Sequence, residues 1–349
     1  MYGDVVNLYG IFRPVAFRFN AERAHRATIA GLKWVPPHRP PDLPASLRTK
    51  VAGLDFHSPV GLAAGFDKDA EVPLQMLSLG FGFVEVGTIT PQPQDGNPKP
   101  RLFRLTEDRA VINRMGFNNH GQPAAFQRLL DCTFRTGPVG VNVGANKDSA
   151  DRIADYVSGV RAMSQVADYL TINISSPNTP GLRGLQDAGM LEELLAAVRA
   201  VGSRKPIFLK VAPDLGERDP ERIAKAAIDH GIDAIIVSNT TVSRPPLKSK
   251  YADEAGGLSG APLKALALDA LRKFRSASGG EMPLIGVGGI ATAEDAFERI
   301  RAGASLVQLY SAMVYDGPGI ARRMAKGLDR LLSREGFASV DSAVGSEKV

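Results

Sequence analysis

The chain has 349 residues, of which 44% are hydrophobic and 23% are charged, as is typical of a soluble globular protein. A single cysteine, Cys132, excludes a disulfide framework and a cysteine-rich metal site, and five scattered histidines show no metal-binding spacing. The net charge of +5 comes mostly from residues 1–40, where six basic residues outnumber two acidic ones, so the nearly neutral remainder does not predict a nucleic-acid-binding surface.

Residues 1–40 predict two short amphipathic helices. Pro14 is expected to end or kink the first near Phe12, and Asn20 to cap a second that ends near Trp34. A basic hairpin of this kind suits an anionic membrane surface, although packing on the main body fits the pattern equally well. Membrane binding and packing on the body are compatible if the groove between the hairpin and the body faces lipid. The first apolar face comprises Val5, Leu8, Phe12, Val15, Ala16 and Phe19.

Neither a membrane span of about 20 apolar residues nor a signal peptide is predicted. From residue 60 onward, eight short apolar runs alternate with helical patterns, which indicates an α/β protein with a parallel sheet. Eight units in about 250 residues match a closed (β/α)8, or TIM, barrel. An open doubly wound sheet is the rival, but the first run ends in AAGFDKD rather than in a dinucleotide fingerprint. The runs are 60–65, 83–88, 139–144, 169–175, 207–212, 234–240, 284–289 and 306–311.

Polar side chains gather where these runs end, which is where such barrels carry their chemistry. Lys210 lies inside an apolar run and is therefore expected to face the site rather than solvent. Carboxylates are nearly absent, so the mouth favours a planar, hydrogen-bonding anion. The run-end residues are Lys68, Thr88, Asn142, Asn173, Lys210, Ser238, Asn239, Thr240, Gly288, Gly289, Tyr310 and Ser311.

The fourth run continues as YLTINISSPNTPG, which ends a buried strand in a loop of hydroxyl and amide groups. Nothing charged lies between Asp168 and Arg183, so a base there must be an activated hydroxyl. Taken alone, SSPN fits a turn that caps the next helix better than it fits a catalytic loop, and only the other motifs of the chain favour catalysis.

The 90–119 insertion predicts two short strands that form a lid or wall over the mouth. GVGGI at 286–290, followed by a helix near Thr292, predicts a phosphate site, and GGLSG at 256–260 supports it.

Nine stretches match one family pattern in order: AAGFDKDA, EVGTITPQPQDGNPKPRLFRL, INRMGFNNHG, NISSPNTPGLRGLQ, LKVAPDL, SNTT, GGLSG, GVGGI and LVQLYS. Together they resemble class 2 dihydroorotate dehydrogenases, the quinone-dependent, membrane-associated FMN enzymes of pyrimidine synthesis. The resemblance implies oxidation of (S)-dihydroorotate to orotate. A base removes a proton from carbon 5, a hydride passes from carbon 6 to the flavin, and a membrane quinone accepts the electrons.

The resemblance also implies individual roles. Ser176 is the expected base, where the soluble class has cysteine, and Thr179 and Phe117 shape the route of its proton. The expected substrate contacts are Lys68, Asn113, Arg114, Met115, Gly116, Phe117, Asn173, Asn178, Asn239 and Thr240. The expected FMN contacts are Ala64, Gly65, Lys68, Thr88, Asn142, Asn173, Lys210, Ser238, Gly260, Gly289, Tyr310 and Ser311, with the last four at the phosphate. The expected quinone contacts are His25, Arg104 and Tyr310.

Two other functions fit parts of the chain. One is an FMN barrel dehydrogenase with a soluble electron acceptor, and the other is a non-catalytic barrel that binds a phosphorylated ligand. Ser176 and the basic hairpin argue against the first, and Ser176, Lys68 and Lys210 against the second. The expected domains are a membrane- and quinone-binding extension over 1–40, an FMN barrel over 41–338 and a disordered tail over 339–349. The expected location is the cytoplasmic face of a bacterial cell membrane.

Overall fold

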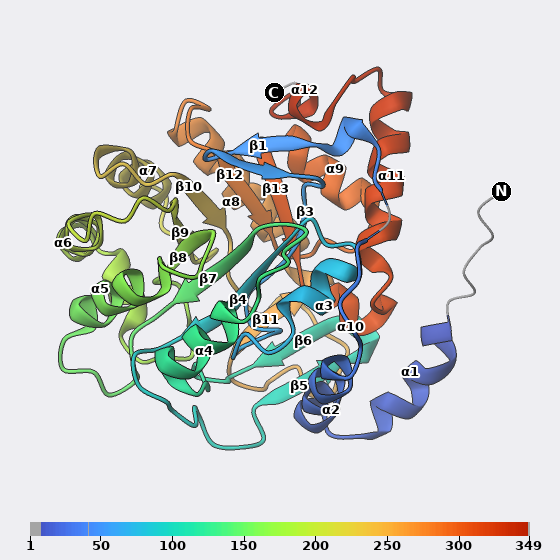
Figure 1. The fold of residues 1–349 in the computed structure, drawn as a ribbon, viewed down its shortest axis with the longest axis horizontal. Helices are drawn as coiled ribbons and strands as arrows, with labels where there is room; N and C mark the ends of the chain where they lie inside the picture. Colours follow the sequence, from blue (N-terminus) through green and yellow to red (C-terminus); the bar gives the residue numbers. More distant parts are fainter. Residues whose placement is uncertain (1–7, 41, 348–349) are drawn as a thin grey trace.

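A computed structural model describes residues 8–40 and 42–347 of the chain (Figure 1). Eight parallel strands close into a barrel, as the alternation of apolar runs predicts. Its strands, in spatial order, are β3 (Val60–Leu62), β4 (Phe83–Ile89), β7 (Val139–Val143), β8 (Tyr169–Asn173), β9 (Ile207–Val211), β10 (Ala234–Val237), β12 (Leu284–Val287) and β13 (Ala304–Leu309). Seven of these strands end before their runs do, whereas β4 continues one residue past its run, to Ile89.

Alternate residues of each strand face opposite sides of the barrel wall. Phe83 packs inside with Tyr169 and Phe208, whereas Val84 and Val86 face the surrounding helices. Gly61 leaves room for the Phe83 ring, since a Cβ at residue 61 would lie 2.3 Å from Phe83 Cζ. The barrel is therefore a packed core rather than a pore.

Helices cover the outside of the barrel (Figure 1). They are α3 (Pro73–Ser78), α4 (Gly121–Leu130), α5 (Arg152–Met163), α6 (Ala188–Arg199), α7 (Asp219–Asp229), α8 (Lys264–Ala277), α9 (Ala293–Arg301), α10 (Ser311–Asp316) and α11 (Ile320–Arg334). A hairpin of β1 (Thr49–Val51) and β2 (Leu54–Phe56) places Phe56 against the inward ring of Phe83, with 5.2 Å between the ring centroids.

The 90–119 insertion contains the two predicted strands, β5 (Leu102–Leu105) and β6 (Ala110–Asn113). A third strand, β11 (Gly257–Gly260), pairs antiparallel with β6, with Leu258 opposite Ile112. GGLSG, the second glycine motif of the predicted phosphate site, is therefore mostly a strand. Gly256 directly precedes this strand, and its φ of +130° and its close approach to the Asn113 carbonyl leave no room for a side chain.

The amino-terminal hairpin consists of α1 (Leu8–Arg18) and α2 (Ala21–Lys33). Two residues of the predicted apolar face lie at the start of this segment. Val5 lies outside the described residues, and Leu8 begins α1. Of the two effects expected of Pro14, an end of the first helix near Phe12 is wrong, because α1 continues through Pro14 to Arg18. The cap is confirmed: the Asn20 side chain accepts from the backbone N–H groups of residues 22 and 23.

The hairpin packs on the body and also exposes apolar side chains. Arg101 pairs with Glu22 at 2.7 Å, and the Tyr9 hydroxyl donates to the Val314 carbonyl at 2.6 Å. Nevertheless Phe12 stays 65% exposed. Among the described residues, no helix is both long and apolar enough to cross a membrane.

Two further segments differ from expectation. Residues 340–343 of the expected tail form α12 (Val340–Ala343), because Ser339 caps it and Val340 is fully buried. Cys132 does not lie in a helix: it follows α4, is half-buried, and donates to the Arg128 carbonyl at 3.2 Å. Burial raises the pKa of this thiol, which keeps it protonated and unreactive.

Candidate active site at the mouth of the barrel

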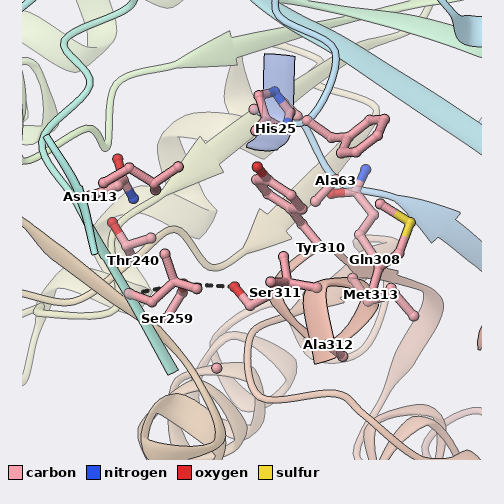
Figure 2. Close-up of a pocket in the computed structure, with 18 of the residues that line it drawn as sticks. His25, Ala63, Asn113, Thr240, Ser259, Gln308, Tyr310, Ser311, Ala312 and Met313 are labelled. Carbon is pink, nitrogen blue, oxygen red and sulfur yellow. Dashed lines mark hydrogen bonds between the residues drawn. The ribbon is translucent and has the colours of Figure 1, made fainter. Parts of the chain in front are cut away.

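A cavity of about 520 Å³ lies at the carboxyl ends of the barrel strands. Its walls come from the strand ends, from the β5–β6–β11 sheet, from the α1–α2 hairpin and from α10. Figure 2 shows His25 near Tyr310 in one part of the cavity and Ser259 hydrogen-bonded to Ser311 in another, 2.7 Å between hydroxyl oxygens. One continuous space therefore reaches from the hairpin to the far glycine-rich loops.

The structure brings nearly all the predicted residues to this cavity. Arg114 is an exception, because its guanidinium turns to Glu254 at 2.7 Å. Asn142 and Thr179 are the others, since neither lines the cavity. The predicted residues that line the cavity are His25, Ala64, Gly65, Lys68, Thr88, Arg104, Asn113, Met115, Gly116, Phe117, Asn173, Ser176, Asn178, Lys210, Ser238, Asn239, Thr240, Gly260, Gly289, Tyr310 and Ser311.

Ser176 lies in the loop after β8 and is 5% exposed. Its hydroxyl accepts from the backbone N–H of Asn178 at 3.3 Å, so the loop is a serine turn. The next α-helix begins only at Ala188, which means that this turn does not cap it. Among the described residues, the buried hydroxyl of nearby Thr179 has no hydrogen-bond partner. A buried hydroxyl beside a cavity and a second unpartnered hydroxyl are consistent with a proton route.

A hydrogen-bonded chain of amides runs under the mouth and begins at Glu85, which the sequence analysis missed. Asn142 Nδ2 donates to Glu85 Oε1 at 2.8 Å, and this contact leaves Asn142 Oδ1 to accept from Asn173 Nδ2 at 3.0 Å. Asn173 Oδ1 in turn accepts from the Ser175 hydroxyl at 2.9 Å. Because an ionised carboxylate only accepts, Glu85 fixes which end of each amide faces which neighbour.

Glu85 also accounts for the buried lysine. Lys210 Nζ lies 4.0 Å from Glu85 Oε1, and both side chains are buried. Burial lowers the pKa of Lys210, and the charge of Glu85 opposes that shift. The signal in the sequence was a glutamate inside the apolar run FVEVG, the same kind of exception that identified Lys210.

Lys68 supplies a second cation at the mouth. It follows β3, and burial lowers the pKa of its ammonium to about 8, while nearby Asp69 acts in the opposite direction. No ion pair engages Lys68 in the part of the chain that the structure describes. Its charge is therefore free to face an anion in the cavity.

The far end of the cavity is built from glycines. Gly288 and Gly289 follow β12 with φ of +111° and +70°, and a Cβ at residue 289 would lie 2.4 Å from the Lys264 Cα. Thr292 then caps α9 through a capping box with Asp295. Backbone N–H groups close to the cavity and two neighbouring helix N-termini provide the hydrogen-bond donors and the partial positive charge that bind a phosphate group.

The end beneath the hairpin is aromatic. His25 lies edge-on to Phe66, 5.3 Å between centroids, and Tyr310 lies 5.7 Å from the same ring. Burial lowers the pKa of His25 to about 4, so its ring is neutral at physiological pH. Arg104 donates to the α1 carbonyls of Ala16 at 3.2 Å and of Phe17 at 3.3 Å. This end therefore suits an uncharged ring that carries hydrogen-bonding oxygens.

Comparison with known proteins agrees with this geometry: residues 46–332 match the model of the family described as dihydroorotate dehydrogenase. This chain belongs to the dihydroorotate dehydrogenase family. Dihydroorotate dehydrogenases are flavoenzymes, in keeping with a large cavity that carries a glycine-rich end.

Several dihydroorotate dehydrogenases are similar over nearly their full length. The dihydroorotate dehydrogenase (quinone) of Erythrobacter litoralis is 62% identical over 97% of this chain and 100% of its own. That of Sphingopyxis alaskensis is 61% identical over 97% of this chain and 96% of its own. The crystal structure of the Eimeria tenella enzyme in complex with ferulenol has a TM-score of 0.89 and 42% identity, over 93% of this chain and 95% of that one.

Proposed function

We propose that this protein oxidises (S)-dihydroorotate to orotate with bound FMN and passes the electrons to a membrane quinone. The observation that carries the proposal is the position of Ser176: a buried hydroxyl that lines a cavity also lined by two lysines, the buried Lys210 and the half-buried Lys68. Family membership supports the reaction, and the printed names of the similar bacterial enzymes support a quinone acceptor.

The residues present fit a flavin nucleotide. Gln308 lines the cavity floor, and its buried Oε1 has no hydrogen-bond partner in the described chain, so it is available to a donor on a ligand ring. Thr88, Ser238 and Lys210 would hold the ring system, and Asn142 would orient Thr88 and Asn173 from behind. Gly260, Gly289, Tyr310 and Ser311 would hold the phosphate end. When bound, the flavin supplies the acceptor for the hydride.

Dihydroorotate would lie between the loop of Ser176 and the amides of the wall. Asn113 Oδ1 accepts from Asn178 Nδ2 at 3.2 Å, which joins the two sides of the pocket. The amides, together with Thr240 and the backbone of residues 115–117, are suited to the ring N–H and C=O groups of the substrate. Lys68 would face its carboxylate. Asn173 and Asn239 complete the set, whereas Arg114 would act only through its backbone, because Glu254 holds its side chain.

Ser176 would remove the proton from carbon 5 of the substrate. A serine hydroxyl is a weak base, so its own proton must leave as the new one arrives. Thr179, whose hydroxyl is buried and unpartnered, and Phe117, which lines the cavity, would define that route. Lys68 would stabilise the negative charge that develops on the substrate, in a site from which water is largely excluded.

The quinone would enter beneath the hairpin. His25 and Tyr310 would contact its head group, and Arg104 would hold α1 in place through the carbonyls of residues 16 and 17. The exposed apolar side chains of α1 and the basic residues of 1–40 favour peripheral attachment to an anionic membrane, on the cytoplasmic face of a bacterial cell. An FMN barrel with a soluble acceptor would need neither feature.

Two half-reactions test the proposal. Protein reconstituted with FMN should lose its flavin absorbance when mixed anaerobically with dihydroorotate and regain it with a lipid quinone analogue. Removal of residues 1–40 should spare the first half-reaction and slow the second at least about tenfold, which corresponds to a loss of about 1.4 kcal/mol. Protein that takes up no flavin would contradict the proposal, and unchanged reoxidation after the deletion would favour a soluble acceptor.

A further inference from the structure

Arg299 is a fully buried arginine that has no place in the mechanism above. It lies on α9, is 1% exposed, and is among the largest fully buried side chains of the described chain. Its Nη2 donates to two backbone carbonyls, that of Gly288 at 2.9 Å and that of Lys264 at 2.6 Å. Nε and Nη1 have no hydrogen-bond partner there. Burying a charged group costs free energy unless the group is paired with an opposite charge and fully hydrogen-bonded.

The contact with Gly288 fixes the direction of a peptide group in the cavity wall. In a trans peptide the C=O and the following N–H point in opposite directions. When the carbonyl of Gly288 faces Arg299, the N–H of Gly289 therefore faces the other way. Gly288 and Gly289 line the cavity and Arg299 does not, so this N–H is turned toward the cavity.

The guanidinium is also a buried positive charge, which Glu298 and Asp295 compensate only in part. Asp295 and Glu298 lie on the same helix, but both pair with Lys264, at 2.6 Å and 3.3 Å. Within the described residues, no carboxylate forms an ion pair with Arg299. Burial lowers its pKa to about 10, which still leaves it protonated at neutral pH. A buried cation of this kind is stabilised by an anion nearby, and the glycine pair is the thin wall between it and the cavity.

The glycines are what allow this arrangement. A Cβ at residue 286 would lie 3.3 Å from the Arg299 Cβ and 3.5 Å from its Cδ, so the side chain runs directly along the strand end. The sequence GVGGI thus leaves room both for a ligand on the cavity side and for Arg299 on the opposite side.

We infer that Arg299 is a positioning residue for the phosphate of the flavin nucleotide. It holds the Gly288 carbonyl away from the cavity, so that the adjoining N–H is presented to the phosphate, and it contributes positive charge from behind the glycine pair. The inference rests on the proposed function, because it takes FMN as the ligand.

The test compares FMN with riboflavin, which lacks only the phosphate. Binding of each to the apoprotein is measured by quenching of flavin fluorescence. In Arg299→Met the dissociation constant for FMN should rise at least about tenfold, while that for riboflavin changes by less than about threefold. Arg299→Lys keeps the charge and should preserve most of the preference for FMN. Arg301→Met removes an arginine from the same helix that does not contact Gly288, and it should change neither constant.

The outcomes separate the alternatives. If both flavins lose affinity equally in Arg299→Met, the residue is only structural and the inference is overturned. If Arg299→Met does not fold, Arg299→Lys decides: a selective loss for FMN of about twofold to fivefold supports the inference, because one of two carbonyl contacts is lost, and equal loss for both flavins overturns it. Wild-type apoprotein that binds neither flavin would instead contradict the proposed function itself.

Discussion

Lys210 and Glu85 face each other inside the barrel, with 4.0 Å between Nζ and Oε1 and almost no exposure to solvent. Lys210 comes from β9 and Glu85 from β4, so the pair spans the interior. Besides Lys210, four side chains hold the carboxylate within the described residues: Asn142, Thr171 and Gln308 donate to it at 2.8, 3.1 and 2.9 Å, and the Tyr169 hydroxyl donates at 3.4 Å. The positive charge at the mouth is therefore anchored on a fixed negative one below it.

Replacing Glu85 by glutamine should destabilise the protein strongly. The amide NH2 group replaces one carboxylate oxygen, so it meets either the donor of Asn142 or the donors of Thr171 and Gln308. The neutral side chain also leaves the Lys210 charge buried without an anionic partner. We expect the free energy of unfolding of the apoprotein to fall by about 3–5 kcal/mol, measured by urea denaturation. Adding Lys210→Met should recover part of that loss. If the double variant is less stable by the full sum of the two single changes, Glu85 and Lys210 do not interact.

Replacing Ser176 by alanine should separate binding from chemistry. The rate at which dihydroorotate reduces the flavin should fall about 10²–10⁴-fold, because the general base is lost, while orotate affinity stays nearly unchanged. Ser175→Ala is the matched control. Ser175 is also buried, but its hydroxyl bonds to Asn173 rather than facing the cavity. The rate of flavin reduction is measured for both variants by stopped-flow absorbance. Equal decreases of this rate in Ser176→Ala and Ser175→Ala would exclude Ser176 as the base.

Orotate binding should depend on pH through Lys68. The ammonium of Lys68 has a pKa of about 8 in the folded protein, below its ordinary value, and an anion prefers the protonated form. Affinity for orotate should therefore be full below pH 8 and fall as pH rises through it, by up to about tenfold per unit. The ratio of wild-type affinity to that of Lys68→Met isolates this effect. A ratio that stays constant from pH 7 to 9 would show that Lys68 does not contact the anion.

The exposed apolar face of α1 should mediate vesicle binding. Ile11, Phe12 and Val15 are 66%, 65% and 56% exposed, so replacing all three by serine removes apolar surface without touching the core. Binding to anionic lipid vesicles, measured by co-sedimentation, should fall at least about tenfold.

Phe134 provides the control for that experiment. It is 88% exposed and lies in the segment after α4, away from the hairpin. Phe134→Ser should leave vesicle binding unchanged. Should Phe134→Ser weaken binding as much as the triple change, the attachment would be general hydrophobic adsorption and not a property of α1.

The barrel could be predicted from the sequence because each strand carries its own signal. The run around Lys210 is apolar on both faces, and its charged exception pointed to the site without any knowledge of its neighbours. The same reasoning predicts Ser176 and Asn173 at the mouth, since polar residues at the carboxyl end of a buried barrel strand lie on the face that carries the site.

What the sequence did not reveal depends on contacts between distant segments. In the sequence, Arg299 is one charge among several on an amphipathic helix, and its burial depends on its packing against Gly286 of β12. α1 continues through Pro14 because contacts such as that between Tyr9 and Val314 hold the helix against the body. Val340 lies in a polar stretch, and its burial cannot be inferred from composition.

The sheet of β5, β6 and β11 joins two excursions of the chain that are more than a hundred residues apart, since Asn113 lies opposite Gly257. β5 and β6 follow β4 in the chain, whereas β11, the partner of β6, comes only after β10. A nascent chain that stops short of residue 257 contains six of the eight barrel strands but not the strand that completes the outer wall of its own pocket. Closure of the barrel by β12 and β13 and completion of the ligand site both depend on the last third of the chain, and are therefore late, long-range events in folding.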